Sequence, residues 1–122
     1  MEQSNLILIV DDDRDSCQIL SEFFKVMNYK VETAEDGKVG LEKFFRSKPT
    51  LVILDIRMPI MDGCQMLKRI REIDTTTPVI IISAQTYLEG AEECIKQGAT
   101  EVLHKPIELN QLDTMVSRHL KS

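Results

Sequence analysis

Four aspartates in this sequence stand where apolar segments end. Asp11, Asp12 and Asp13 follow an apolar run at residues 6–10, and Asp55 follows a second run at residues 51–54. Two carboxylates about 5 Å apart repel each other by roughly 3 kcal/mol at an effective dielectric constant near 20. Such carboxylates are either solvated on loops, or they take up a proton or bind a cation. Because no histidine or cysteine accompanies them, the cation we expect is a hard one, Mg²⁺, with Mn²⁺ as a possible substitute.

Two further polar residues follow apolar runs in the same way. Ser83 comes after residues 79–82, and Lys105 comes after residues 101–104. Carboxylates, a divalent ion, a lysine and a hydroxyl together can capture a phosphoryl group and neutralise its charge. An aspartate can also be the nucleophile and form an acyl phosphate. The ordinary alternative for each residue is a solvated or turn-capping side chain at the end of a strand.

These residues can act together only if the fold brings the ends of the apolar runs to one place. Near-continuous runs rich in Val and Ile are typical of parallel strands that are covered on both faces. A fifth segment, residues 30–34, alternates more and is predicted to be an edge strand. Helical spacing of apolar residues fills the gaps and predicts helices over residues 14–27, 37–46, 63–73, 86–97 and 108–120.

This alternation predicts an α/β fold, a doubly wound parallel five-stranded sheet with helices on both sides. The carboxyl ends of parallel strands lie along one edge of the sheet, where ligands bind at the topological switch point. We therefore expect Asp11, Asp12, Asp55, Ser83 and Lys105 to meet in one crevice.

Composition limits the classes of protein that remain. We interpret the 122 residues as one domain, 1–122, with a net charge of -5 that argues against nucleic-acid binding by this domain. No apolar run is long enough to span a membrane, and no signal peptide is evident, so we expect a cytoplasmic location.

Cysteine spacing and helical periodicity give two further expectations. Cys17, Cys64 and Cys94 show no CxxC spacing, so we expect small buried or half-buried hydrophobic residues without a disulfide framework or a zinc site. Ile73 and Ile95 fall on apolar helical faces and are predicted to be buried.

The chain resembles, along essentially its full length, the receiver domain of two-component response regulators. The resemblance rests on four motifs in a fixed order: VDDD (10–13), LDIRMPIMDG (54–63), IISA (81–84) and HKPI (104–107). It implies a flavodoxin-like (βα)5 fold with strand order 2-1-3-4-5. It also implies a phosphorylation-controlled signalling switch, which is not an enzyme but a phosphoacceptor that catalyses its own phosphotransfer and autodephosphorylation.

The resemblance assigns roles to residues at matching positions. Asp55 is expected to accept a phosphoryl group from a phosphohistidine of a histidine kinase or a histidine phosphotransfer protein. Asp12 is expected to ligate Mg²⁺ directly, with support from Asp11, and Arg57 is expected to ligate it through the backbone carbonyl. No cofactor other than the metal is implied.

The remaining implied roles concern the response to phosphorylation. Ser83 and Lys105 are expected to contact the phosphoryl group, with Lys105-Pro106 as a cis peptide bond. The surface formed by the fourth helix, the fifth strand and the fifth helix is then expected to change and to bind a downstream effector or a second copy. If the chain is a whole protein, it would relay phosphate or act by docking. If it is part of a longer one, the output lies elsewhere.

Several positions depart from the family pattern or have an ordinary explanation. Val102 occupies a position that is usually aromatic in the family, and Tyr87 is a candidate substitute. Gln85 and Arg57 border the expected phosphoryl position and should tune the lifetime of the phosphorylated state. Outside the site, Asp13 is expected to cap the first helix, His104 to be partly exposed, and His119 to interact with the dipole of the last helix.

Three alternatives belong to other functional classes. A metal-dependent aspartyl-phosphate phosphohydrolase would typically need a second aspartate two residues after the nucleophile, where this chain has Arg57. A phosphorylation-independent interaction module would not need the complete set of polar residues. A flavin-binding flavodoxin would need a loop that cradles phosphate, and here the first strand ends in carboxylates.

Overall fold

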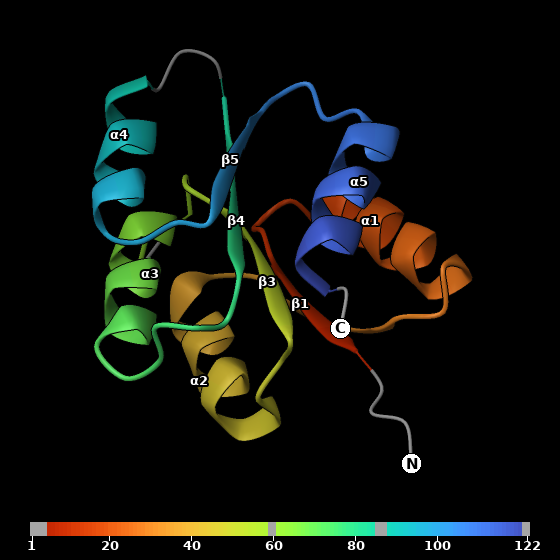
Figure 1. Ribbon diagram of the computed structural model, residues 1–122, viewed down its shortest axis with the longest axis horizontal. Coiled ribbons are helices and arrows are strands. Elements are labelled where there is room, and N and C mark those ends of the chain that lie inside the picture. Colours follow the sequence, from red (N-terminus) through yellow and green to blue (C-terminus); the bar gives the residue numbers. More distant parts are fainter. Residues whose placement is uncertain (1–4, 59–60, 85–87, 121–122) are drawn as a thin grey trace.

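A computed structural model describes residues 5–58, 61–84 and 88–120 of the chain, with only the backbone of residues 88–91. Within these ranges, strands and helices alternate from end to end (Figure 1). The strands are β1 (Leu6–Val10), β2 (Lys30–Ala34), β3 (Leu51–Asp55), β4 (Val79–Ser83) and β5 (Glu101–His104). The helices are α1 (Arg14–Val26), α2 (Gly37–Ser47), α3 (Gly63–Arg71), α4 (Leu88–Lys96) and α5 (Leu109–Leu120).

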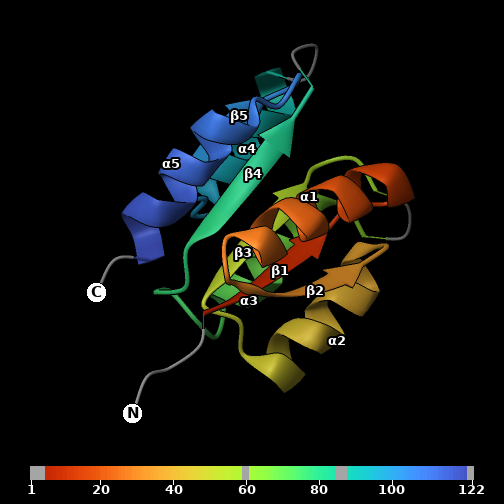
Figure 2. The ribbon, with the colours of Figure 1, turned by 90° about the vertical axis from the view of Figure 1, so that its right-hand side faces the viewer.

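The strands form one parallel sheet in the order β2-β1-β3-β4-β5, as predicted. Helices α1 and α5 lie on one side of the sheet, and α2, α3 and α4 lie on the other (Figures 1 and 2). The order reverses at β1, whose neighbours are β2 and β3. The crevice expected at such a switch point therefore lies beyond the carboxyl ends of β1 and β3.

Two apolar clusters stabilise the sheet, one on each face. Alternate residues of each inner strand point to opposite faces, so Ile7 and Ile9 belong to one cluster while Leu8 and Val10 belong to the other. The first cluster contains residues of α1 and α5, and the second contains residues of α2, α3 and α4. Because both faces are covered, β1, β3 and β4 are apolar along nearly their whole length.

The ends of the helices show the expected capping residues. Asp13 caps α1 by accepting a hydrogen bond from the backbone N–H of Asp15, which confirms the role predicted for it. Asp62 caps α3 in a capping box with Gln65. Gly98, just after α4, has φ +106°, a conformation in which L residues other than glycine are strained.

Some apolar residues predicted to be buried are exposed. Ile73 is 73% exposed just beyond the end of α3, and Ile95 is 57% exposed on α4. The prediction failed for Ile73 because α3 ends at Arg71, before the helical register reaches it. Ile95 adjoins the buried Cys94, but the stripe of α4 that faces the sheet is too narrow to cover both.

The cysteines are buried or half-buried, as predicted, but the expectation that none forms a disulfide was wrong for two of the three. Cys64 and Cys94 form a disulfide between α3 and α4, with Cα atoms 5.0 Å apart. The sequence separation of 30 residues carries no signature of this pair, because packing of two helices brings the sulfurs together. Cys17 is a free, buried cysteine, as expected.

None of the described helices combines the length and the apolar character needed to cross a membrane.

Candidate functional site

The polar residues that follow the strands converge at the carboxyl edge of the sheet. Asp11 and Asp12 come directly after β1, Asp55 is the last residue of β3, and Lys105 comes directly after β5. They line an open crevice of about 680 Å³. Its other lining residues are Asp13, Ile56, Arg57, Met58, Asp62 and Ala84. The predicted crevice is thus present, and four of the five residues expected in it line it.

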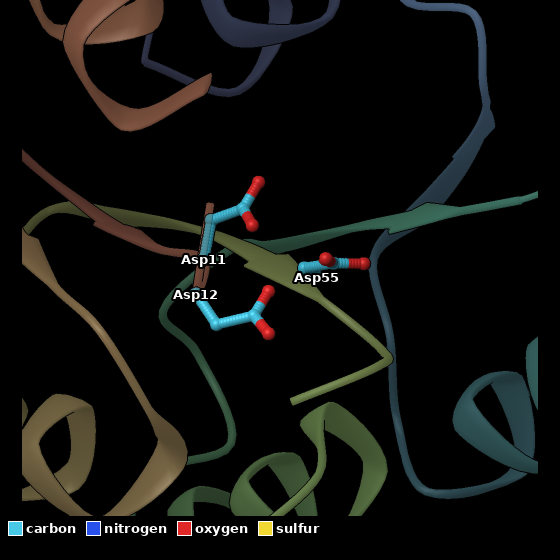
Figure 3. Close-up of side chains that lie close together, drawn as sticks. All are labelled: Asp11, Asp12 and Asp55. Carbon is cyan, nitrogen blue, oxygen red and sulfur yellow. The ribbon is translucent and has the colours of Figure 1, made fainter. Parts of the chain in front are cut away.

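Three carboxylates form the centre of the crevice. One oxygen from each of Asp11, Asp12 and Asp55 lies within 4.8 Å of the other two. Figure 3 shows the three side chains gathered at the ends of their strands. Asp11 and Asp55 are only 3% and 5% exposed, whereas Asp12 is exposed to solvent. The arrangement places negative charge partly out of water, which costs free energy unless a positive charge or a proton compensates.

The titration of Asp11 reflects this cost. Burial raises the pKa of its carboxyl from 3.8 to about 6, and the negative charge of Asp55 contributes in the same direction. Two groups oppose the change, the backbone N–H of Asp13, which donates to Asp11 Oδ1 at 3.0 Å, and the positive charge of Lys105. Without a cation, Asp11 therefore holds a proton more readily than an ordinary aspartate.

Asp55 has the closest positive group. Lys105 Nζ lies 3.6 Å from Asp55 Oδ2. The backbone N–H of Arg57 donates a long hydrogen bond of 3.4 Å to Asp55 Oδ1. The carboxylate of Asp55 is therefore held between a lysine and a backbone donor while it faces the open crevice, which suits a group that reacts with an anionic phosphoryl donor.

Ser83 lies at the edge of the site in a different orientation. Its side chain is 1% exposed, and its hydroxyl donates to the backbone carbonyl of Ala84 at 3.0 Å. Ala84, and not Ser83, is among the residues that line the crevice. The position at the end of β4 agrees with the sequence prediction, but the hydroxyl is turned to the backbone of the next residue.

Gly63 allows the start of α3 to pack against the end of β3, where Asp55 lies. Sequence spacing did not indicate this contact. A Cβ atom at Gly63 would lie 2.4 Å from the carbonyl oxygen of Asp55. The backbone N–H of Gly63 also donates to the carbonyl of Ile56 at 2.8 Å. The absence of a side chain at residue 63 therefore lets α3 begin directly beneath Asp55.

The remaining residues singled out in the sequence lie around the site. Val102 is partly buried against the cluster that contains residues of α2, α3 and α4, and His104 is exposed. His119 has a carboxylate partner, since its Nε2 lies 2.5 Å from Glu101 Oε2. The peptide bond between Lys105 and Pro106 is cis, as expected. Gln85 and Tyr87 lie outside the described residues.

The donor set fits a hard divalent cation. All three clustered groups are carboxylates, the donors that Mg²⁺ and Mn²⁺ prefer, and the described residues place no histidine or cysteine in the cluster. A divalent charge would offset the two effects that raise the pKa of Asp11, its burial and the repulsion from Asp55.

Comparison with known families gives a match over most of the chain. The profile described as response regulator receiver domain matches residues 7–117. Among curated proteins, the regulatory protein AtoC of Escherichia coli is 38% identical over 121 residues, which are 99% of this chain and 26% of AtoC. The chain therefore spans about a quarter of the length of that relative.

Solved structures show the same architecture. The chemotaxis protein CheY4 of Vibrio cholerae is 31% identical, with a TM-score of 0.89 over 97% of this chain and 100% of CheY4. A response regulator receiver domain protein from Clostridium thermocellum is 28% identical, with a TM-score of 0.90 over 95% of this chain and 94% of that one.

Proposed function

This chain belongs to the family of response regulator receiver domains, and on that premise we propose that Asp55 is the residue that accepts the phosphoryl group of this phosphorylation-controlled switch. The observation that carries the proposal is the pairing of Asp55 with Lys105 at 3.6 Å, beside two further carboxylates. Asp55 combines an open approach from the crevice with a nearby positive charge. Asp11 is as buried, but the ion pair of Lys105 is formed with Asp55.

The metal site of this proposal consists of Asp12, Asp11 and Asp55, with the backbone carbonyl of Arg57 as a further ligand. A bound Mg²⁺ would offset negative charge on the transferring phosphoryl oxygens and on the carboxylates. Asp12, the exposed member, offers a carboxylate on the solvent side, and the more buried Asp11 supports it. Mn²⁺ has the same ligand preferences and could substitute.

The chain's own residues then perform the transfer. A carboxylate oxygen of Asp55 attacks the phosphorus of a phosphohistidine on a histidine kinase or histidine phosphotransfer protein. The N–P bond breaks, and its electron pair and a proton end on the departing imidazole. Lys105, which lies 3.6 Å from Asp55, would contact the phosphoryl oxygens and offset their negative charge. Attack by water on the acyl phosphate later returns Asp55 to its carboxylate, so transfer and loss both take place on this domain.

The response to phosphorylation starts at Ser83 and Lys105. In the present arrangement, the Ser83 hydroxyl donates to the carbonyl of Ala84. A phosphoryl group on Asp55 would offer a stronger, charged acceptor to this hydroxyl and to Lys105. Exchange of these partners would shift the population of the α4–β5–α5 surface. That surface would contact a downstream effector or a second copy, in the cytoplasm.

The phosphohydrolase alternative is not favoured. Such an enzyme would need an acid/base group two residues after Asp55, and Arg57, an exposed arginine, stands there. The phosphorylation-independent alternative is not favoured either, since the carboxylates and Lys105 converge in the same crevice.

Phosphoryl uptake from a small acyl phosphate, followed by intact-protein mass spectrometry, tests the proposal. We expect the wild-type chain to gain one phosphoryl group in the presence of Mg²⁺, and Asp55→Asn to gain none. Asp13→Asn is the matched control, because it removes a carboxylate from the same crevice while asparagine still caps α1. It should retain uptake. If Asp55→Asn gained the phosphoryl group as readily as Asp13→Asn, the assignment of Asp55 would be wrong.

A further inference from the structure

The disulfide between Cys64 and Cys94 joins two helices on the same side of the sheet. Cys64 is the second residue of α3, and Cys94 lies two residues before the end of α4. Their Cα atoms are 5.0 Å apart, within the range in which a disulfide forms without movement of the backbone. The packing of α3 against α4 therefore places the two cysteines at a separation that suits a disulfide.

The two sulfurs differ in their access to solvent. Cys94 is 0% exposed and belongs to the apolar cluster that contains residues of α2, α3 and α4. Cys64 is half-buried at the edge of the same cluster. Among the described residues, Cys64 therefore offers a small thiol in solution the more accessible side of the bond.

The fold does not depend on this bond for its core. Met66, Leu67 and Ile70 of α3 are each 0% exposed against the sheet. The far end of α3 is tied to the chain after α4 by Arg71, whose Nε donates to the carbonyl of Gly98 at 3.0 Å. Because these contacts are independent of the sulfurs, the domain can stay folded with two thiols in place of the bridge.

The disulfide connects α4 to α3, which begins next to Asp55. Gly63, the neighbour of Cys64, has no room for a side chain against the Asp55 carbonyl. At the other end, the carbonyl of Cys94 accepts hydrogen bonds from the N–H groups of Gln97 and Ala99, both at 3.1 Å, which close the end of α4. Among the described side chains of α4, residues 92–96, Cys94 is the buried one. The bond therefore restrains α4 at the buried residue of its described part.

The third cysteine cannot take part in exchange within the folded domain. Cys17 lies on α1 and packs in the cluster on the opposite face of the sheet. The sheet separates its sulfur from Cys64 and Cys94, so the one disulfide that can form within the folded domain is the bond between Cys64 and Cys94.

We propose that Cys64 and Cys94 form a reversible redox-modification site, which exchanges with a small thiol–disulfide couple and restrains α4 when oxidised. This goes beyond the phosphoryl switch and does not depend on it. The oxidation state of the bond would then be a second signal to the domain, because it determines whether α4 is joined to the start of α3, which packs against Asp55.

The exchange is a two-electron thiol–disulfide reaction. A small thiolate attacks Sγ of Cys64, the bond between the two cysteine sulfurs breaks, and its electron pair leaves on Sγ of Cys94, which takes a proton. A second thiolate attacks the outer sulfur of the mixed disulfide and releases Cys64, which is also protonated. The protein disulfide is reduced to two thiols, and two small thiols are oxidised to one disulfide.

Equilibration of the folded chain in buffers with graded ratios of reduced to oxidised glutathione tests the site. Free thiols are trapped by alkylation and counted by mass spectrometry, and backbone hydrogen exchange is measured on both end states. We expect wild type and Cys17→Ala to change by two thiols in one reversible step. We expect the amides of residues 92–98 to exchange at least about tenfold faster in the reduced form, with those of β1 unchanged.

Two single variants complete the test. Cys64→Ser and Cys94→Ala should show the faster exchange of residues 92–98 in both buffers and should lack the two-thiol step, with Cys94→Ala gaining at most one glutathione, on Cys64. The proposal is overturned if the bond resists reduction until the protein is unfolded. It is equally overturned if the folded thiols never oxidise, or if α4 exchanges at the same rate in both forms.

Discussion

Replacement of Asp11 by asparagine should stabilise the domain in the absence of divalent ions. Asparagine keeps an oxygen that can accept the hydrogen bond from the Asp13 N–H, but it carries no charge to desolvate or to repel Asp55. The carboxyl pKa of Asp11 is 3.8 in the unfolded chain and about 6 in the folded one. At 1.36 kcal/mol per pKa unit, the charged form destabilises the folded state by up to about 3 kcal/mol.

The effect should be smaller in practice and should depend on pH with a definite sign. Because the crevice is open to solvent, we expect roughly 1–2 kcal/mol after screening. Because the pKa of Asp11 is higher in the folded chain than in the unfolded one, the carboxyl is protonated in both states at low pH and does not destabilise the fold there. The fold loses this stability as the pH rises through about 6, where the buried carboxyl becomes charged. The gain from Asp11→Asn should therefore be near zero at about pH 4 and complete above about pH 7.

Urea unfolding in a chelating buffer measures this difference, with the disulfide kept in one oxidation state. Glu42→Gln, an exposed position on α2, is the control because it changes the net charge equally at a distance from the crevice. With Mg²⁺ added, the order should reverse, since wild type gains binding free energy that the variant lacks. A destabilised Asp11→Asn above pH 7 without metal, or a gain that does not vary with pH, would refute the electrostatic account.

Three further predictions concern single contacts. Gly63→Ala should destabilise the fold by about 2 kcal/mol, because its Cβ would lie 2.4 Å from the Asp55 carbonyl, and acyl-phosphate labelling should slow in parallel. Asp74→Ala should cost about 1 kcal/mol in urea unfolding, through lost bonds such as that from the Thr77 hydroxyl. Since these bonds lower the pKa of Asp74 to about 2, that cost should be present above about pH 4 and fade as the pH falls toward 2, and a pH-independent cost would contradict it. Reduction of the Cys64–Cys94 bond, which closes a loop with a sequence separation of 30, should lower the free energy of unfolding by up to roughly 3.5 kcal/mol, and calorimetry with and without a reductant should detect it.

The order of the elements and the place of the site follow from the sequence by itself. Strands β1, β2 and β5 have the bounds predicted for them, because a short run of Val, Ile and Leu between turn residues is a local signal. Once five such runs alternate with helical segments, parallel pairing brings the carboxyl ends of the strands to one edge. The meeting of Asp11 with Asp55 was therefore predictable from spacing.

Only the tertiary structure decided which side chains touch and how far each is buried. The bond between Cys64 and Cys94 depends on the packing of α3 against α4, and the exposure of Ile95 depends on the width of the stripe that α4 turns to the sheet. The Ser83 hydroxyl faces the Ala84 carbonyl because of a rotamer that spacing does not encode. Periodicity is a property of neighbouring residues, whereas these features depend on distances between elements far apart in the chain, which exist only after folding.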